Sequence, residues 1–180
     1  YTRYPHAGER PEADLNFYQQ IYFHQLGAPA SSDEYSAGKD FPRIAEIELH
    51  TSDDGRWLLA SVANGDGGEF SHHLRETKAG SPWRQITRHE DGIKEIDFRH
   101  DGAALYLRSV KGSPRGKLLR MPTADGVLGE AEVIVPESDA VIEGFLLTAK
   151  HLFIADMIGG PSRIRQLDLD GSHESIVPMP

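Results

Sequence analysis

Short apolar segments, separated by turn residues, follow one another along the whole chain. Each segment is about five to eight residues long, is rich in Val, Ile, Leu, Phe and Tyr, and is bounded by clusters of Gly, Pro and Asp. Such segments are typical of strands joined by turns. The pattern therefore predicts an all-β fold.

One unit of this pattern recurs. A tight turn, an apolar strand and a glycine-bearing loop occur in TSDDGRWLLASVANG, in FRHDGAALYLRSVKG and in LTAKHLFIADMIGG. The turn glycines Gly55 and Gly102 are 47 positions apart, and the third turn, at Ala149 and Lys150, follows about as far again. Each unit has one apolar strand before its turn and two more after its loop. Four antiparallel strands in such a period indicate the blades of a β-propeller.

The repeat predicts a single domain, a partial β-propeller of about three and a half blades. Four-stranded antiparallel blades are expected at residues 41–90, 91–138 and 139–180, the last of them ending in the strand ESIVPM at 174–179. Residues 1–40, with YTRYP and FYQQIYFHQLG, are expected to supply outer strands of an incomplete blade. The chain would then hold about half of a propeller, which usually has four to eight blades. The alternative is a β-sandwich, but sandwiches do not usually repeat a four-strand unit.

The stretch NGDGGEF, residues 64–70, combines three glycines with two carboxylates. A dinucleotide fingerprint would need glycine where Phe70 stands, and no P-loop Lys-Ser or Lys-Thr follows. The residue order of an EF-hand calcium loop is absent too. DLDGSHE, from Asp168, comes nearer to that order, but its Asp170-Gly171 suits a hairpin turn. EFSHHLRETKAG could form a short helix, yet its counterparts in the other units are strands, so we expect a strand here as well.

We interpret NGDGGEF as the connection between the second and third strands of its blade. Chain direction then places it, with KGSPRG and IGGPS, at the end of the blades opposite to the tight turns. Long loops gathered at one end of a rigid scaffold are where binding sites are usually found. Wide connections without a function remain the alternative.

Charge and composition exclude several classes of partner and site. The chain has 28 acidic and 19 basic residues, a net charge of -9, so nucleic acid is not an expected partner. It contains no cysteine, which excludes disulfides and thiolate metal sites. No apolar stretch approaches the ~20 residues that span a bilayer, and the first residues lack the basic-then-apolar order of a signal peptide. We therefore expect a soluble protein without a membrane partner, and the composition leaves its compartment open. Because Tyr1 stands in an expected strand, we also expect a piece of a longer polypeptide.

Several segments together resemble one known family. GKDFPRIAEIELHTSDDGRWLLASVANGDGGEF, SPRGKLLRMP, VIVPE and GGPSRIRQLDLDG, with YTRYP and FYQQIYFHQLG, are similar to the propeller domain of prolyl oligopeptidases, particularly bacterial ones. The resemblance implies a seven-bladed propeller that covers an α/β-hydrolase domain of the same polypeptide, the pair hydrolysing short peptides after proline. It implies no cofactor and no metal, and a protein of the cytoplasm or periplasm of a bacterium. No G-x-S-x-G nucleophile elbow occurs, so no catalytic residue is expected in this chain, which would gate and select substrate.

The resemblance also indicates site residues. The connection entering a blade and the one after its second strand contribute to the substrate pocket of the family. The matching stretches, FPRI at 41–44 and NGDGGEF, give the substrate-facing candidates Arg43, Ile44, Asn64 and Asp66. Arg115 and Arg163 are candidates for pairing with acids across the seam between the domains.

Two other functions stay open. A stand-alone propeller could bind a protein partner through the same loops. A propeller with its own chemistry, such as a lactonase, would need metal-binding carboxylates in the channel, for which the inner strands offer Glu46, Glu48, Glu95, Asp97 and Glu143. Finally, if blades at either end lack a neighbour, their bare apolar faces lead us to expect that the isolated chain self-associates.

Overall fold

The computed structural model describes residues 1–178, in which fifteen strands form four antiparallel sheets. The first sheet has three strands, β1 (Thr2–Arg3), β2 (Gln20–Phe23) and β3 (Glu34–Ala37). The second sheet contains β4 (Ala45–Thr51), β5 (Trp57–Asn64), β6 (Phe70–Glu76) and β7 (Arg84–Thr87). The third contains β8 (Ile93–Phe98), β9 (Ala104–Ser109), β10 (Lys117–Pro122) and β11 (Glu132–Val135). The fourth contains β12 (Val141–Leu147), β13 (His151–Met157), β14 (Ser162–Asp168) and β15 (Ser175–Val177).

The helices of the described residues are five single 3-10 turns. They are η1 (Glu12–Asp14), η2 (Ala30–Ser32), η3 (Gly65–Gly67), η4 (His89–Asp91) and η5 (Leu128–Glu130). Within residues 1–178, none is long and apolar enough to cross a membrane.

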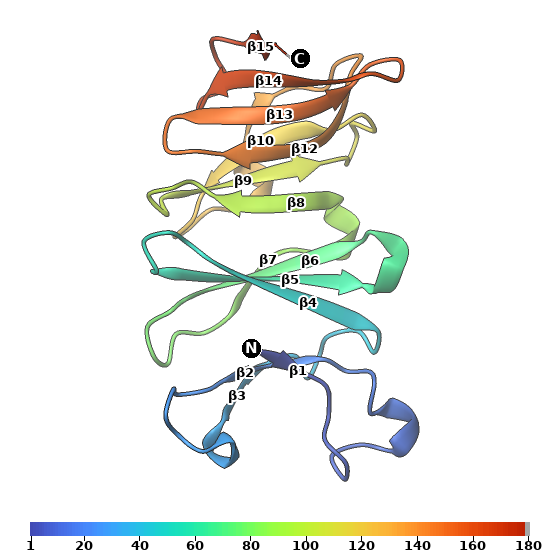
Figure 1. Cartoon of the computed structure of the whole chain (residues 1–180), viewed down its shortest axis with the longest axis vertical. Coiled ribbons are helices and arrows are strands. Elements are labelled where there is room, and N and C mark those ends of the chain that lie inside the picture. Colours follow the sequence, from blue (N-terminus) through green and yellow to red (C-terminus); the bar gives the residue numbers. More distant parts are fainter. Residues whose placement is uncertain (179–180) are drawn as a thin grey trace.

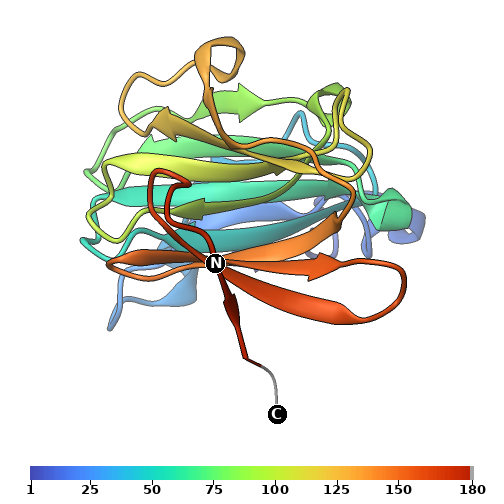
Figure 2. The ribbon, with the colours of Figure 1, turned by 90° about the horizontal axis from the view of Figure 1, so that it is seen from above.

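The arrangement of the sheets is that of a partial propeller. Strands stand in chain order within each sheet, and successive sheets follow one another along the molecule (Figure 1). Seen from above, the sheets lie one behind another (Figure 2), so the two-layer sandwich considered from the sequence is wrong. Residues 70–76 form strand β6, and the possible helix there is not formed. The sequence did not predict β3, and Met179 of the expected strand 174–179 lies outside the described residues.

The core lies between neighbouring sheets, because strand side chains alternate between two faces. In β9, Leu105 and Leu107 join a cluster with Trp57 and Leu59 of the second sheet. Tyr106, from the opposite face of β9, packs with residues of the fourth sheet. Each internal sheet is therefore apolar on both faces, which accounts for the nearly continuous apolar runs in its strands.

The tight turns lie at one end of the sheets. Gly55 has φ +68° and its N–H donates to the Ser52 carbonyl at 2.8 Å, and Gly102 repeats this with φ +67° and the Arg99 carbonyl at 2.7 Å. Each is a four-residue turn whose last position is left-handed, a conformation that favours glycine. Neighbouring turns touch, since His100 Nδ1 lies 2.6 Å from Asp53 Oδ2. The longer loops, which join the second strand of each four-stranded sheet to the third, therefore lie at the opposite end of the sheets.

Candidate functional site

Three glycine-bearing loops lie at the same end of the sheets, opposite to the tight turns. They join β5 to β6, β9 to β10 and β13 to β14, and all lie along the right-hand edge of Figure 1. η1 of the N-terminal segment lies at the same edge. The chain direction within each sheet had predicted this placement of the three loops.

Two adjoining pockets open beside the loop that follows β5. Their volumes are about 250 Å³ and 450 Å³, and both are lined by Tyr4, Glu46, Gly65 and Asp66. The smaller pocket also contains three further side chains of interest, those of Phe17, Arg43 and Ile44. The structure thus brings together Arg43, Ile44 and Asp66, which lie up to 23 positions apart in the sequence. Asn64, at the end of β5, lies next to the loop but does not line either pocket.

Arg43 is held by the N-terminal segment. Its Nη2 and Nε lie 2.9 Å and 3.0 Å from Asp14 Oδ1, and its guanidinium carbon lies 3.6 Å from the centre of the Phe17 ring. An ion pair and a cation–π contact therefore fix the side chain while it stays half exposed. Arg43 forms a wall of the smaller pocket and ties η1 to the entrance of the second sheet.

The loop that follows β5 has one well-defined shape. Gly65 has φ +64°, a conformation that favours glycine, and a Cβ atom there would lie 2.7 Å from Ile44 Cδ1, so a larger residue would require the Ile44 side chain to shift. Gly68, with φ +67°, accepts a hydrogen bond at its carbonyl from Lys94 Nζ of the next sheet. The Asn64 N–H donates to the Glu69 carbonyl at 2.9 Å. The position of Asp66 is therefore set by contacts on both sides of the loop.

The pockets carry negative charge. Glu46, Glu48 and Asp66 line the larger one, together with the aromatic rings of Tyr4 and Phe70. Among the described residues that line either pocket, the only basic one is Arg43, which is already paired with Asp14. The arrangement can accommodate an uncharged or cationic chain against an aromatic and aliphatic wall.

The channel carboxylates do not assemble into a metal centre in the part of the chain that the structure describes, which contains no group of three or more His, Asp or Glu side chains suited to one ion. Glu95 Oε2 instead accepts hydrogen bonds from Arg108 Nε and from the Phe145 N–H, both at 3.3 Å. Burial raises the pKa of Glu95 and the pKa of Asp97, against the opposing effect of Arg108 on Glu95. Glu95 thus joins the third sheet to the fourth.

The two arginines considered for a domain seam have different surroundings. Arg115 lies in the loop between β9 and β10, with Nη1 3.5 Å from the exposed carboxylate of Asp139. Arg163 lies within β14, with Nε 3.2 Å from the buried carboxylate of Asp156 in β13. Arg115 is exposed at the loop end, whereas Arg163 is directed into its own sheet.

Sequence reasoning missed four residues of this site, Tyr4, Phe17, Phe70 and Lys94. The two N-terminal aromatics stand in irregular segments that the repeat does not cover. Lys94 stands in an apolar strand, where alternation predicts an outward direction but no partner. Only Phe70, the last residue of NGDGGEF, had a usable signal, since it lies within a stretch already selected.

Known proteins that are similar in sequence to this chain include a family of propeller domains. The sequence model of the prolyl oligopeptidase N-terminal β-propeller domain matches residues 1–180. The chain is 26% identical over 163 residues to the prolyl endopeptidase of Elizabethkingia meningoseptica, which covers 89% of this chain and 22% of that protein. It is 30% identical over 103 residues to the prolyl endopeptidase of Elizabethkingia miricola, covering 56% of this chain and 14% of that protein.

Solved structures show the same fold. One, from a structural and mechanistic analysis of two prolyl endopeptidases, has a TM-score of 0.83 at 20% identity and covers 100% of this chain and 26% of its own. Prolyl oligopeptidase B from Galerina marginata has a TM-score of 0.78 at 16% identity, covering 98% of this chain and 25% of its own. The chain thus spans about a quarter of the length of these structures. With the family match over its whole length, the chain belongs to the prolyl oligopeptidase family, as part of that family's N-terminal β-propeller domain.

Proposed function

We propose that this chain is the non-catalytic gating and substrate-selecting part of a proline-specific serine endopeptidase that hydrolyses short peptides after proline. The observation that carries the proposal is that three glycine-bearing loops, and two pockets beside the first of them, lie at one end of the sheets. The relatives named prolyl endopeptidases supply the reaction, and a hydrolase domain of the same polypeptide would supply the catalytic residues.

In this proposal the blades act as a filter and the loop end faces the hydrolase domain. A channel between blades admits short, flexible peptides and rejects folded proteins. Ile44, which is 45% exposed, offers an apolar contact to the peptide, while Asn64 and Asp66 offer polar contacts at the seam. Closing these loops over a bound peptide would exclude water from the reaction. Arg115 and Arg163 are proposed to face acids of the hydrolase domain, and exposed Arg115 is the better placed of the two.

The test uses the full-length polypeptide and a short reporter peptide with proline before the cleaved bond. Ile44→Ser and Asp66→Ala are each expected to lower kcat/KM by roughly tenfold, the effect of about 1.4 kcal/mol of lost transition-state stabilisation. Leu26→Ser is the matched control, because Leu26 is 91% exposed and lines neither pocket. Unchanged kcat/KM in both pocket variants would refute the assignment of the site.

The same experiment distinguishes the peptidase function from the second candidate function, which is binding of a protein partner by a stand-alone propeller. A full-length polypeptide that cleaves no proline-containing peptide would contradict the proposal. The loop end would then be assigned to binding of a protein partner.

A further inference from the structure

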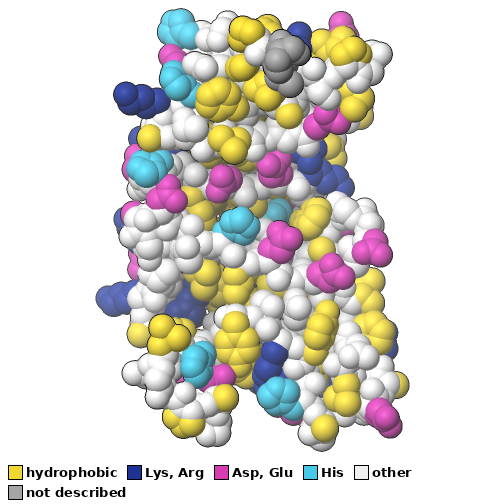
Figure 3. Space-filling view, in the orientation of Figure 1, with side chains coloured by type: hydrophobic (Ala, Val, Ile, Leu, Met, Phe, Trp, Pro, Cys, Tyr) yellow, Lys and Arg dark blue, Asp and Glu magenta, His cyan; other side chains and the backbone are white. Residues whose placement is uncertain are grey.

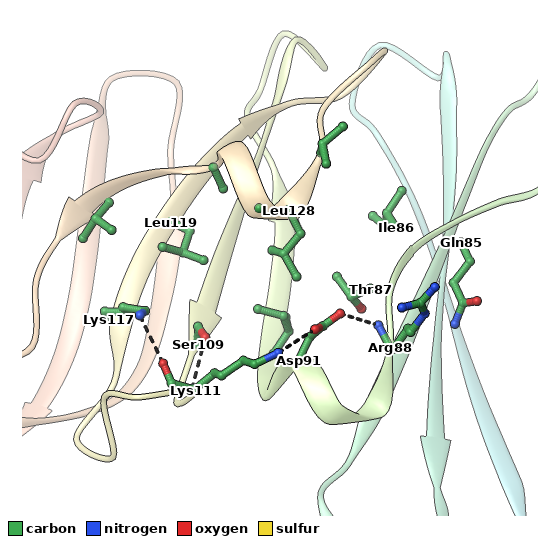
Figure 4. Close-up of a pocket in the computed structure, with 15 residues that line it drawn as sticks. Gln85, Ile86, Thr87, Arg88, Asp91, Ser109, Lys111, Lys117, Leu119 and Leu128 are labelled. Atoms are coloured by element: carbon green, nitrogen blue, oxygen red, sulfur yellow. Dashed lines mark hydrogen bonds and ion pairs between the residues drawn. The ribbon is translucent and has the colours of Figure 1, made fainter.

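A third and larger pocket lies between the second and third sheets, away from the site described above. Its volume is about 550 Å³, within the range of small-molecule sites. It is open to solvent and is flanked by β7 and η4 on one side and by β10, η5 and β11 on the other (Figure 4). None of the residues that line it lines either of the pockets beside Asp66.

One part of this pocket is apolar. Ile86, Ile93 and Leu119 are buried at its wall, and Leu128 of η5 covers them. Val127 and Val133 also line the pocket, and they remain 56% and 50% exposed. Exposed valines beside a buried apolar wall provide a surface that an aliphatic chain would cover.

The other part of the pocket is basic. Figure 4 shows Lys117, Ser109, Lys111, Asp91 and Arg88 on the side of the pocket away from Leu119, Leu128 and Ile86. Lys111 Nζ lies 3.0 Å from Asp91 Oδ1, so one positive charge is compensated. Lys117 Nζ donates to the Lys111 carbonyl at 3.1 Å, and neither Lys117 nor Arg88 forms an ion pair within residues 1–178.

The balance of charge is opposite to that of the chain as a whole. Three cations and one carboxylate line the pocket, in a protein with a net charge of -9. The Lys117 ammonium has a backbone carbonyl as its hydrogen-bond partner and no carboxylate partner within residues 1–178, so an anion placed beside it is favoured. A small inorganic anion would leave the apolar wall exposed to water, whereas a ligand with an apolar part would cover it.

We propose that this pocket binds a small amphipathic carboxylate, a linear acyl chain with one terminal carboxylate. The carboxylate lies beside Lys117 and Lys111, and the acyl chain runs along Leu119, Leu128 and Val133. The basic part of the pocket is complementary to the carboxylate, and its apolar part is complementary to the acyl chain. The binding is independent of the peptidase function proposed above.

The test measures octanoate binding to the full-length polypeptide by calorimetry, with hexanoate, octylamine and octanol as comparisons. The full-length polypeptide is used because exposed apolar side chains of the first and last sheets of the isolated chain would also take up octanoate. Octanoate is expected to bind at one site, and hexanoate more weakly by roughly fifteenfold, since each buried methylene contributes about fourfold. Octylamine is expected not to bind.

Two variants locate the site. Lys117→Met keeps the aliphatic stem and removes the charge, and it is expected to weaken octanoate binding about tenfold while leaving octanol binding unchanged. Val133→Glu, at an exposed position, is expected to abolish octanoate binding. Lys150→Met, an exposed lysine in a turn, is the control, and thermal melting verifies that each variant is folded. Absence of octanoate binding, equal binding of octylamine, or unchanged affinity in both variants would overturn the proposal.

Discussion

A single lysine connects the glycine-rich loop of one sheet to the next sheet. Lys94 Nζ donates to the Gly68 carbonyl, and Gly68 has a left-handed backbone that leaves this carbonyl directed toward β8. The bond joins the loop that carries Asp66 to β8, in addition to the close approach of Gly65 to Ile44. Lys94 is therefore a positioning residue for the candidate site, although it lines neither pocket.

We expect Lys94→Met to loosen this loop without unfolding the sheets. Loss of a charge-assisted hydrogen bond worth about 1 kcal/mol should raise the amide exchange rates of residues 65–69 roughly fivefold. Lys150→Met is the matched control. Exchange rates in this loop that equal those of the control would show that Gly65 and Ile44 alone fix its shape.

Two adjacent histidines make stability depend on pH. Burial, assisted by His73 and His89, lowers the pKa of His72 from 6.5 to about 4, and burial together with His89 lowers the pKa of His73 to about 4. The unfolded chain binds protons below pH 6.5 that the folded chain does not bind until about pH 4. Stability is therefore complete above pH 6.5 and is lost as the pH falls toward 4.

His72 alone should account for about 3 kcal/mol of this loss, since one pKa unit corresponds to about 1.4 kcal/mol. Urea titrations across this pH range are expected to show a smaller loss for His72→Gln than for the original chain. Leu26→Ser, at a position that is 91% exposed and changes no titratable group, should leave the loss unchanged. An equal pH dependence in all three proteins would contradict the assignment to His72.

At the residue scale, the sequence predicted candidates but not their partners. Ile44 and Asp66 were selected because their stretches match a family, and the structure places both at one pocket. The pairing of Arg43 with Asp14 was not predictable, because 29 positions separate them and η1 lies outside the repeat. The same holds for Lys94, whose partner is a backbone carbonyl and carries no sequence signal.

At the scale of elements, strands β13 and β14 share a buried ion pair. Asp156 is fully buried, and Arg165 donates to it through Nε at 2.5 Å and through Nη2 at 3.0 Å. Arg163 Nε adds a third contact at 3.2 Å. Removing one member of such a pair leaves the charge of the other buried with less compensation, and this lowers the free energy of unfolding.

Asp156→Ala is therefore expected to lower the free energy of unfolding by about 3–5 kcal/mol in urea titrations. Glu174→Gln is the matched control, because Glu174 also pairs with Arg165, at 3.0 Å, but is half exposed. That change should cost less than about 1 kcal/mol. Similar costs for the two substitutions would show that solvent reaches Asp156.

The elements themselves were largely predictable, because the propeller repeats a local pattern. Residues 70–76 were ambiguous when taken alone, and comparison with the other units decided correctly for strand β6. β3 was missed because its sequence, EYSA, has little apolar character and no counterpart in the three full units. The pocket between the second and third sheets was not predictable either, since its walls come from different units and meet only when the sheets pack.

At the scale of the whole molecule, the chain on its own is expected to show no proline-directed peptidase activity. Its sequence contains no G-x-S-x-G nucleophile elbow, and its similarity is to a propeller domain. A chromogenic proline reporter incubated with the purified chain checks this, beside the full-length polypeptide as positive control. Cleavage by the chain that disappears when one of its own serines is replaced would contradict the expectation.

Exposed apolar side chains are concentrated on the two terminal sheets. Ile142, Leu152 and Ile154 of the fourth sheet pack on the third, but Val141, Leu146 and other large apolar residues of its strands face solvent. The first sheet and the loops around it expose another group, Tyr1, Tyr4, Phe23, Leu26 and Tyr35. Figure 3 shows hydrophobic side chains at the surface of both ends of the molecule.

Since internal sheets bury both of their faces, we expect the isolated chain to associate with further copies through these terminal surfaces. The repeat means that a second copy offers a similar blade surface, and the apolar area removed from water favours contact. Light scattering at micromolar concentration is expected to show dimers or larger species, and Leu146→Ser combined with Ile176→Ser should shift them toward monomer. Val127→Ser, at an exposed position between β10 and β11 of the third sheet, is the control. A folded monomer at all concentrations would show that the polar residues on these faces keep them hydrated.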